Sequence, residues 1–213
     1  MSIERARKIK VILFDVDGVL TDGTIWLFPA PAGTEQSTAQ HAEQYANSAG
    51  YGVVSKTMIE AKGFHAHDGT SISLAKLGGL KVGIVTKRIS ETVAIRARDL
   101  KLDYVYQGQA NKLEAFHDVM QKAEVGPEEV AFVGDDVIDL PIMRRCGLAI
   151  AVPNGRQLVK DTAHWITPNP GGSGAGRDAV EYILSAKGIL EDVIETYIEE
   201  RKLAPAGIST GHN

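Results

Sequence analysis

The sequence has 213 residues, of which 44% are hydrophobic and 23% are charged, so it can bury the core of one α/β domain. The formal net charge of −4 gives no overall basic field that would favour nucleic acid or an anionic membrane, and we expect neither as a partner. No apolar run approaches the roughly 18 residues of a membrane span, and the single cysteine, Cys146, excludes an internal disulfide. We therefore expect a cytoplasmic protein in which Cys146 packs as a small hydrophobic residue.

Short apolar segments alternate with segments of helical pattern along most of the chain. Nearly continuous apolar runs are typical of strands in a parallel sheet that is covered on both faces. Strands are predicted at 10–16, 81–86, 104–108, 130–135 and 148–152. Helices are predicted at 71–79, 90–102, 111–123, 139–146 and 189–202. The alternation predicts a doubly wound α/β fold, which binds ligands beyond the carboxyl ends of its strands.

One region after the first strand interrupts this alternation. Strands near 24–28 and 56–61 are predicted to form a small β-hairpin, and 28–55 reads as an insertion rich in Ala, Gly, Pro, Ser and Gln. The insertion is too small for an independent domain, so we expect no full cap domain. We predict that it lies near the mouth of an active site or in a subunit contact.

Polar and charged residues follow the predicted strands. They are Asp15 and Asp17 after the first strand, Thr86, Lys87 and Arg88 after the second, Lys112 after the third, and Asp135, Asp136 and Asp139 after the fourth. In a parallel sheet all of these groups converge on one edge. Carboxylates so close together repel one another unless a divalent cation shares them, and ligands that are all oxygen favour Mg²⁺. The six histidines lack the spacing of a zinc site.

The same residues can support phosphoryl transfer. Asp15 can attack phosphorus and form an aspartyl phosphate. Asp17 points to the same side of the strand, so it can protonate the leaving oxygen and then activate the hydrolytic water. Thr86 can hydrogen-bond the phosphoryl oxygens, and Lys112 can neutralise both the phosphate and the nucleophile.

The expected magnesium site uses the carboxylates at the ends of the first and fourth strands. We expect Asp15, the main-chain carbonyl of Asp17, and Asp135 to bind the ion directly. Asp136 belongs to the same site, where it and Asp139 would orient the metal's waters and Lys112. Asp139 alternatively caps the helix that follows it.

Four segments together resemble a known superfamily. DVDGVLTDG (15–23), Thr86, Lys112 and GDDVIDLPIM (134–143) are similar to the four motifs of the haloacid dehalogenase superfamily of phosphatases. LDYVYQGQANKLEAF (102–116) and HDG (67–69) resemble one branch, the 3-deoxy-D-manno-octulosonate 8-phosphate phosphatases. The resemblance covers roughly residues 8–185 apart from the insertion.

This resemblance implies a Rossmann-like core and a Mg²⁺-dependent phosphomonoesterase of lipopolysaccharide biosynthesis. Its substrate would be a phosphorylated 2-keto-3-deoxy sugar acid. It further implies a homotetramer that is built through the hairpin, in which a neighbouring subunit closes the active site. On this basis we assign residues 1–188 to the phosphatase domain and 189–213 to a C-terminal helix and flexible tail.

Four residues are expected to bind the substrate, in or beside segments where the chain departs from the family pattern. They are Asp68, Lys87, Arg88 and Arg177. The two guanidinium groups match a carboxylate in bidentate fashion, although each arginine can also be a solvated side chain, and Asp68 can also be part of an Asp-Gly turn. The family has Thr-Gly-Arg where this chain has Thr86-Lys87-Arg88, and an arginine where this chain has His67.

These departures leave other functions open. One is hydrolysis of a nine-carbon sugar acid phosphate or another small sugar phosphate. A phosphomutase shares the aspartyl phosphate step but generally needs a cap. A regulatory or scaffolding subunit would keep the fold and oligomerise with little turnover. The four charged residues Asp15, Asp17, Lys112 and Asp135 count against that last alternative, because a site without turnover has no need of them.

Overall fold

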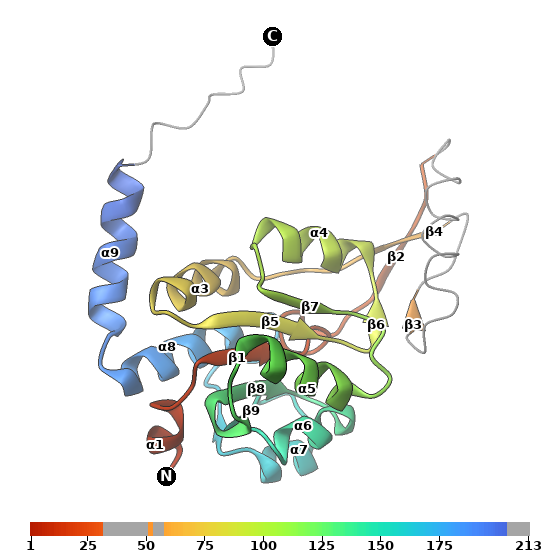
Figure 1. Cartoon of the computed structure of the whole chain (residues 1–213). Coiled ribbons are helices and arrows are strands. Elements are labelled where there is room, and N and C mark those ends of the chain that lie inside the picture. Colours follow the sequence, from red (N-terminus) through yellow and green to blue (C-terminus); the bar gives the residue numbers. More distant parts are fainter. Residues whose placement is uncertain (32–50, 53–57, 204–213) are drawn as a thin grey trace.

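The computed structural model describes residues 1–31, 51–52 and 58–203, and of 51–52 and 200–203 it describes the backbone alone. Six parallel strands form the central sheet in the order β10-β9-β8-β1-β5-β7 (Figure 1). They are β1 (Val11–Phe14), β5 (Lys81–Val85), β7 (Tyr104–Tyr106), β8 (Val130–Gly134), β9 (Leu148–Ala151) and β10 (Trp165–Ile166). This sheet confirms the predicted doubly wound α/β fold.

Helices cover both faces of the sheet (Figure 1). On one face lie α3 (Ala66–Leu77), α4 (Glu91–Asp99) and α8 (Ala175–Lys187), and on the other α5 (Lys112–Ala123), α6 (Leu140–Met143) and α7 (Gln157–Thr162). A hydrophobic cluster lies on each face of the sheet, and the side chains of β1 alternate between them. Ile12 and Phe14 pack in the cluster under α3, α4 and α8, and Val11 and Leu13 pack in the cluster under α5, α6 and α7. Because both faces are buried, all four residues of β1 are apolar.

The five predicted strands are all present, and the sixth, β10, was not predicted because its two residues are too short for a pattern. Trp165 of β10 stacks on Tyr182 of α8 with ring centroids 4.1 Å apart. Helix α3 begins at Ala66, earlier than predicted, so the Asp-Gly pair at 68–69 lies in its first turn. Cys146 is buried, as expected.

The predicted hairpin is present as an arm that projects from the sheet (Figure 1). Its strands β2 (Trp26–Pro29) and β4 (Met58–Ala61) are antiparallel, with Trp26 opposite Ala61. Most of the predicted insertion, residues 32–50 and 53–55, lies outside the described residues. Its segment β3 (Tyr51–Gly52) pairs in parallel with β6 (Arg88–Ile89), so this part lies beside the end of β5.

Two further helices lie near the start and near the end of the described chain. They are α1 (Ser2–Ala6) and α9 (Leu190–Leu203), and two 3₁₀ turns cover Pro127–Glu129 and Val137–Asp139. Gly188 ends α8 with φ 73°, and α9 then packs on α3 through the buried Val193. The division of the chain at residue 188 stays a prediction. None of the described helices has the length and apolar character needed to cross a bilayer.

Candidate active site

The carboxyl ends of β1, β5 and β8 form one edge of a cavity of about 290 Å³. Phe14 of β1 is level with Ile84 of β5 and Val133 of β8, so the residues after these strands emerge side by side. The cavity is lined by Asp15, Asp17, Thr86, Lys87, Arg88, Asp135, Asp136 and Ile138. The expected convergence of charged groups at this edge is therefore present.

Asp15 directly follows β1 at this edge of the sheet and is almost fully buried. Its main chain still belongs to the sheet, since its N–H donates to the Val133 carbonyl at 2.9 Å. Its carboxylate accepts the N–H of Val16 at 2.7 Å, which fixes one oxygen. Burial, followed by the opposing effects of Lys112 and Asp139, raises the pKa of Asp15 to about 7. A carboxyl group with this pKa is only partly ionised near pH 7, even with the charge of Lys112 beside it.

Lys112 supplies a positive charge beside Asp15. It is the first residue of α5, and the side chain of Asn111 caps that helix by accepting the Leu113 N–H at 3.2 Å. The Lys112 Nζ lies 3.0 Å from Asp15 Oδ1 and 2.6 Å from Asp139 Oδ1, with 1% of the side chain exposed. Burial lowers its pKa, but the two carboxylates outweigh burial and raise it above the usual value. Lys112 is therefore a fixed cation.

Asp135 completes a group of carboxylates that can hold a metal ion. Single carboxylate oxygens of Asp15, Asp135 and Asp139 all lie within 4.8 Å of one another. The Oδ1 atom of Asp135 is buried and makes no hydrogen bond among the described residues. Burial, with the charges of Asp15 and Asp139, raises the pKa of Asp135 to about 8. An all-oxygen donor set with an unpaired buried oxygen fits Mg²⁺.

The loop after β1 is shaped to leave room for Asp135. Gly18 has φ 92°, and a Cβ atom there would lie 2.3 Å from Asp135 Oδ2. Any other residue would therefore push the Asp135 carboxylate away and strain the backbone. Asn154 ties this loop to the other side of the site, because its amide donates to the Gly18 carbonyl at 2.9 Å and accepts the Gly171 N–H at 2.8 Å. The sequence analysis did not identify Asn154.

The two remaining acidic residues after β8 have different roles. Asp139 is buried, and besides holding Lys112 it accepts the N–H groups of Asp135 at 3.0 Å and Asp136 at 3.3 Å. Both of its oxygens are thus engaged, which fits the predicted role of orienting Lys112. Asp136 is exposed, lines the cavity and accepts the Val137 N–H at 2.7 Å. It lies outside the three-carboxylate group, so its part in the metal site stays a prediction.

Thr86 and the two basic residues after it lie along the opposite wall of the cavity. Thr86 is buried, and its hydroxyl oxygen accepts the Arg88 N–H at 3.3 Å. Because this bond uses an oxygen lone pair, the hydroxyl proton can be directed to a ligand in the cavity. Lys87 and Arg88 are half-buried at the same wall. Their predicted contact with substrate is compatible with this placement and stays a prediction.

Asp68 and Arg177 are not among the residues that line the cavity. Asp68 is buried in α3 and accepts the main-chain N–H of Arg177 at 2.9 Å, so it caps the first turn of α8. Burial is the first cause that raises the pKa of Asp68. The Arg177 side chain forms an ion pair with Glu181 one turn along the same helix. The described contacts of both residues are structural, so the structure offers no support for their predicted substrate contacts.

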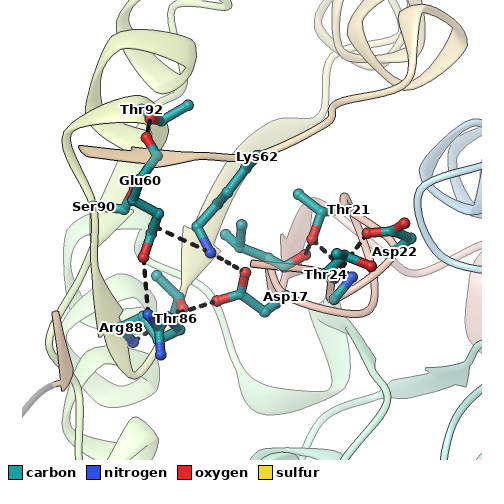
Figure 2. Close-up of polar contacts among 12 residues, drawn as sticks. Asp17, Thr21, Asp22, Thr24, Glu60, Lys62, Thr86, Arg88, Ser90 and Thr92 are labelled. Atoms are coloured by element: carbon teal, nitrogen blue, oxygen red, sulfur yellow. Dashed lines mark hydrogen bonds and ion pairs between the residues drawn. The ribbon is translucent and has the colours of Figure 1, made fainter. Parts of the chain in front are cut away.

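Asp17 lies at the cavity mouth within a closed set of ion pairs, which we call the ion-pair ring (Figure 2). Asp17 contacts Lys62 and Arg88, and Glu60 contacts the same two cations. Glu60 belongs to β4 of the arm, and Lys62 directly follows that strand. The sequence analysis missed both. Their alternation of charge at positions two apart, in a strand that is otherwise apolar, was the available signal.

Comparisons with known proteins indicate the family of this chain. A family model described as haloacid dehalogenase-like hydrolase matches residues 71–175. The chain is 35% identical over 190 residues to the 3-deoxy-D-manno-octulosonate 8-phosphate phosphatase KdsC of Escherichia coli K12. The match covers 89% of this chain and 87% of the relative.

Two solved structures of 3-deoxy-D-manno-octulosonate 8-phosphate phosphatases share the fold of this chain. A 3-deoxy-D-manno-octulosonate 8-phosphate phosphatase from Moraxella catarrhalis, in complex with magnesium ion, phosphate ion and a KDO molecule, is 31% identical with a TM-score of 0.75, covering 92% of this chain and 97% of that one. The phosphatase from Yersinia pestis is 33% identical with a TM-score of 0.74, covering 89% and 88%. Given this identity over most of both chains, the present chain belongs to the 3-deoxy-D-manno-octulosonate 8-phosphate phosphatase family of haloacid dehalogenase-like hydrolases.

Proposed function

We propose that this chain hydrolyses 3-deoxy-D-manno-octulosonate 8-phosphate with Mg²⁺ as cofactor. One observation carries the proposal. Asp15 is buried against Lys112 and beside Asp135 at the strand ends, in a chain that is 35% identical to such a phosphatase over 89% of its length. The substrate name comes from relatives, and one of their solved structures contains magnesium, phosphate and KDO.

The first step transfers the phosphoryl group to Asp15. An oxygen of Asp15 forms a bond to phosphorus while the bond from phosphorus to the sugar oxygen breaks. Asp17, two residues on, gives a proton to the departing sugar oxygen. Lys112 offsets negative charge on Asp15 and on the phosphoryl group, and the Thr86 hydroxyl donates to a phosphoryl oxygen. Mg²⁺, which Asp15, Asp135 and the Asp17 carbonyl would hold, supplies further charge stabilisation when bound.

The second step releases inorganic phosphate. Asp17, now ionised, takes a proton from a water molecule, and the resulting hydroxide attacks phosphorus. The bond between phosphorus and Asp15 breaks, which returns the nucleophile to its carboxylate form. Asp17 has the exposure needed for this exchange of roles, since 19% of its side chain is accessible while Asp15 has 5%. One carboxyl group therefore serves as acid and then as base.

The cavity wall formed by Lys87 and Arg88 is suited to the sugar acid. Both are half-buried beside the phosphoryl site, and 24% of the Arg88 side chain is exposed. A guanidinium and an ammonium group here match a substrate that carries a carboxylate at the end opposite its phosphate. We include in this proposal the predicted preference for a 2-keto-3-deoxy sugar acid over neutral sugar phosphates.

The arm is the part of the chain that we propose to mediate a homotetramer. The exposed fractions of Trp26, Leu27 and Phe28 are 55%, 50% and 47%, and Ile59 on the opposite strand is 37% exposed. Apolar residues at adjacent positions of a projecting hairpin are unusual for a free surface, and contact with another copy would bury them. A cytoplasmic location is also part of the proposal, and the single free cysteine, Cys146, supports it.

Release of inorganic phosphate from a panel of phosphate esters tests the function. The panel holds 3-deoxy-D-manno-octulosonate 8-phosphate, a nine-carbon keto sugar acid 9-phosphate and glucose 6-phosphate, each with Mg²⁺ and with a chelator. We expect the eight-carbon acid to have the highest kcat/KM and the chelator to abolish turnover. Highest efficiency with the nine-carbon acid would change the substrate assignment, and absence of turnover with every ester would refute the function.

A further inference from the structure

We propose that Lys62 is a positioning residue that holds the Asp17 carboxylate toward the reacting bond. Lys62 comes from the arm, outside the motifs that gather at the strand ends. The inference rests on the proposed phosphatase function, because it concerns the proton transfer step of that reaction. It extends the active site to a segment that the sequence pattern assigns only to a structural hairpin.

The ion-pair ring gives Asp17 a fixed orientation. Its two oxygens contact different cations: Oδ1 contacts the Lys62 Nζ, and Oδ2 lies 3.7 Å from the Arg88 Nε. Glu60 holds the same two cations from the other side, with Oε1 3.4 Å from the Lys62 Nζ and Oε2 2.9 Å from the Arg88 Nη2. Figure 2 shows Glu60, Lys62 and Arg88 grouped on the side of Asp17 that faces the arm. Rotation of the Asp17 carboxylate would break contacts on both of its oxygens.

Burial restricts the movement of the Lys62 side chain. The Lys62 side chain is 0% exposed and that of Glu60 is 8% exposed, so neither ion is free to move into solvent. A buried ammonium group is stable only when carboxylates pair with it, and Lys62 has two. Burial raises the pKa of Glu60, but the hydrogen bond from Arg88 and the charge of Lys62 outweigh it and lower that pKa. Glu60 therefore remains an anchor for both cations.

The strand that carries Lys62 is itself fixed to the core. The Thr92 hydroxyl of α4 donates to the Glu60 carbonyl at 3.2 Å, which ties β4 to the helix after β6. Glu60 and Lys62 are two positions apart, so an extended backbone presents both side chains on one face. The arm thus supplies an anchored cation to Asp17, much as Asp139 anchors Lys112 for Asp15.

A positioning role predicts a loss that depends on the leaving group. p-Nitrophenyl phosphate needs little protonation of its leaving group, whereas phenyl phosphate depends on a well-placed acid, and neither carries a sugar acid. In Lys62→Gln we expect kcat/KM, which reports only the steps up to departure of the leaving group, to fall about ten- to a hundredfold for phenyl phosphate and by no more than about threefold for p-nitrophenyl phosphate. Lys62→Arg should recover part of the loss. Lys81→Gln, which alters an exposed lysine at the far end of β5, is the control.

A second comparison tests whether Lys62 acts through Asp17. In an Asp17→Asn background, Lys62→Gln should cause no further loss, because the group that it positions can no longer transfer a proton. Equal losses with both esters, or a full additional loss in the Asp17→Asn background, would overturn the inference and indicate direct binding of the phosphoryl group. Should Lys62→Gln fail to fold in a thermal melt, Glu60→Gln, which loosens the amine without removing it, is expected to show the same dependence on leaving group.

The activity of the wild-type protein tests the phosphatase function separately from the positioning role of Lys62. Turnover of both esters by the wild type supports the phosphatase function whatever the Lys62 variants do. Absence of turnover by the wild type, with these esters and with the sugar phosphates of the panel, would remove the phosphatase function, and the positioning role with it.

Discussion

Removal of divalent cations should make the stability of this protein fall as the pH rises. Asp15 and Asp135 are buried next to each other, and their pKa values are raised from 3.8 to about 7 and about 8. A carboxyl whose pKa is higher in the folded state binds its proton more tightly when folded. The folded state is therefore favoured at low pH, and this advantage is lost as the pH rises from about 4 to about 8.

The size of the effect follows from the pKa of Asp15. A rise from 3.8 to about 7 corresponds to about 4 kcal/mol of unfolding free energy, at about 1.36 kcal/mol for each pH unit. Asp135 interacts with Asp15, so its contribution is not simply additive, and we take about 4 kcal/mol for the pair. For a chain of this size that is a decrease in Tm of roughly 8–16 °C between pH 4 and pH 8.

The assay is thermal or urea unfolding at a series of pH values, with a chelator and with saturating Mg²⁺. Bound Mg²⁺ favours the ionised carboxylates, so it should raise Tm more at pH 8 than at pH 5. Asp135→Asn is the matched variant: in chelator at pH 8 it should melt above the wild type, and it should gain little from Mg²⁺. A wild-type Tm that is flat or rises with pH in chelator would refute the reasoning, as would an Asp135→Asn variant that melts below the wild type at pH 8.

Three substitutions test other parts of the site. Asp15→Asn should lower kcat by about a thousandfold or more while the Tm measured in chelator is unchanged or higher, and appreciable remaining turnover would argue against an aspartyl phosphate. Lys112→Met leaves two buried carboxylates unpaired and should reduce the unfolding free energy in urea by about 3–5 kcal/mol, more at pH 8 than at pH 5, and a loss below about 1 kcal/mol would contradict this. Gly18→Ala should weaken Mg²⁺ binding, measured by calorimetry, by about tenfold or more, since the new Cβ would meet Asp135 Oδ2 at 2.3 Å; unchanged affinity would show that the loop can shift.

The strand ends could be predicted because their chemistry is local to short segments. Asp15 follows an apolar run, and Asp135 follows another, and a parallel sheet brings the two ends together whatever the rest of the chain does. Lys112 was predictable by the same logic, since it starts the helix after a strand. The confirmed fold class rests on this alternation of strands and helices.

Contacts between distant elements could not be predicted in the same way. Asp68 follows the arm in sequence, but its helix is packed so that its carboxylate meets the amino-terminal end of α8. Arg177 lies in that helix, and its side chain pairs with Glu181 along the helix surface. The Asp68 contact is not indicated by a pattern of period 2 or 3.6, because it depends on how α3 and α8 pack. The Arg177–Glu181 pair is local to one helix, and it was missed because no helix was predicted over that segment. Glu60 and Lys62 have the spacing of one strand face, but their contacts with Arg88 and Asp17 depend on how the arm lies against the end of the sheet, which no local pattern indicates.

The two motif aspartates differ because different parts of the chain surround them. Asp15 is enclosed by the sheet and by Lys112, where a negative charge must be shared with a cation in order to act as a nucleophile. Asp17 faces the arm, and its partners come from β4 and from the end of β5. With Asp17 as the proposed acid and base, a change that displaces the arm should alter proton transfer while leaving the nucleophile and its metal site in place. The hairpin whose outer residues we propose to bind neighbouring subunits also carries partners of Asp17, so assembly and proton transfer would depend on one element.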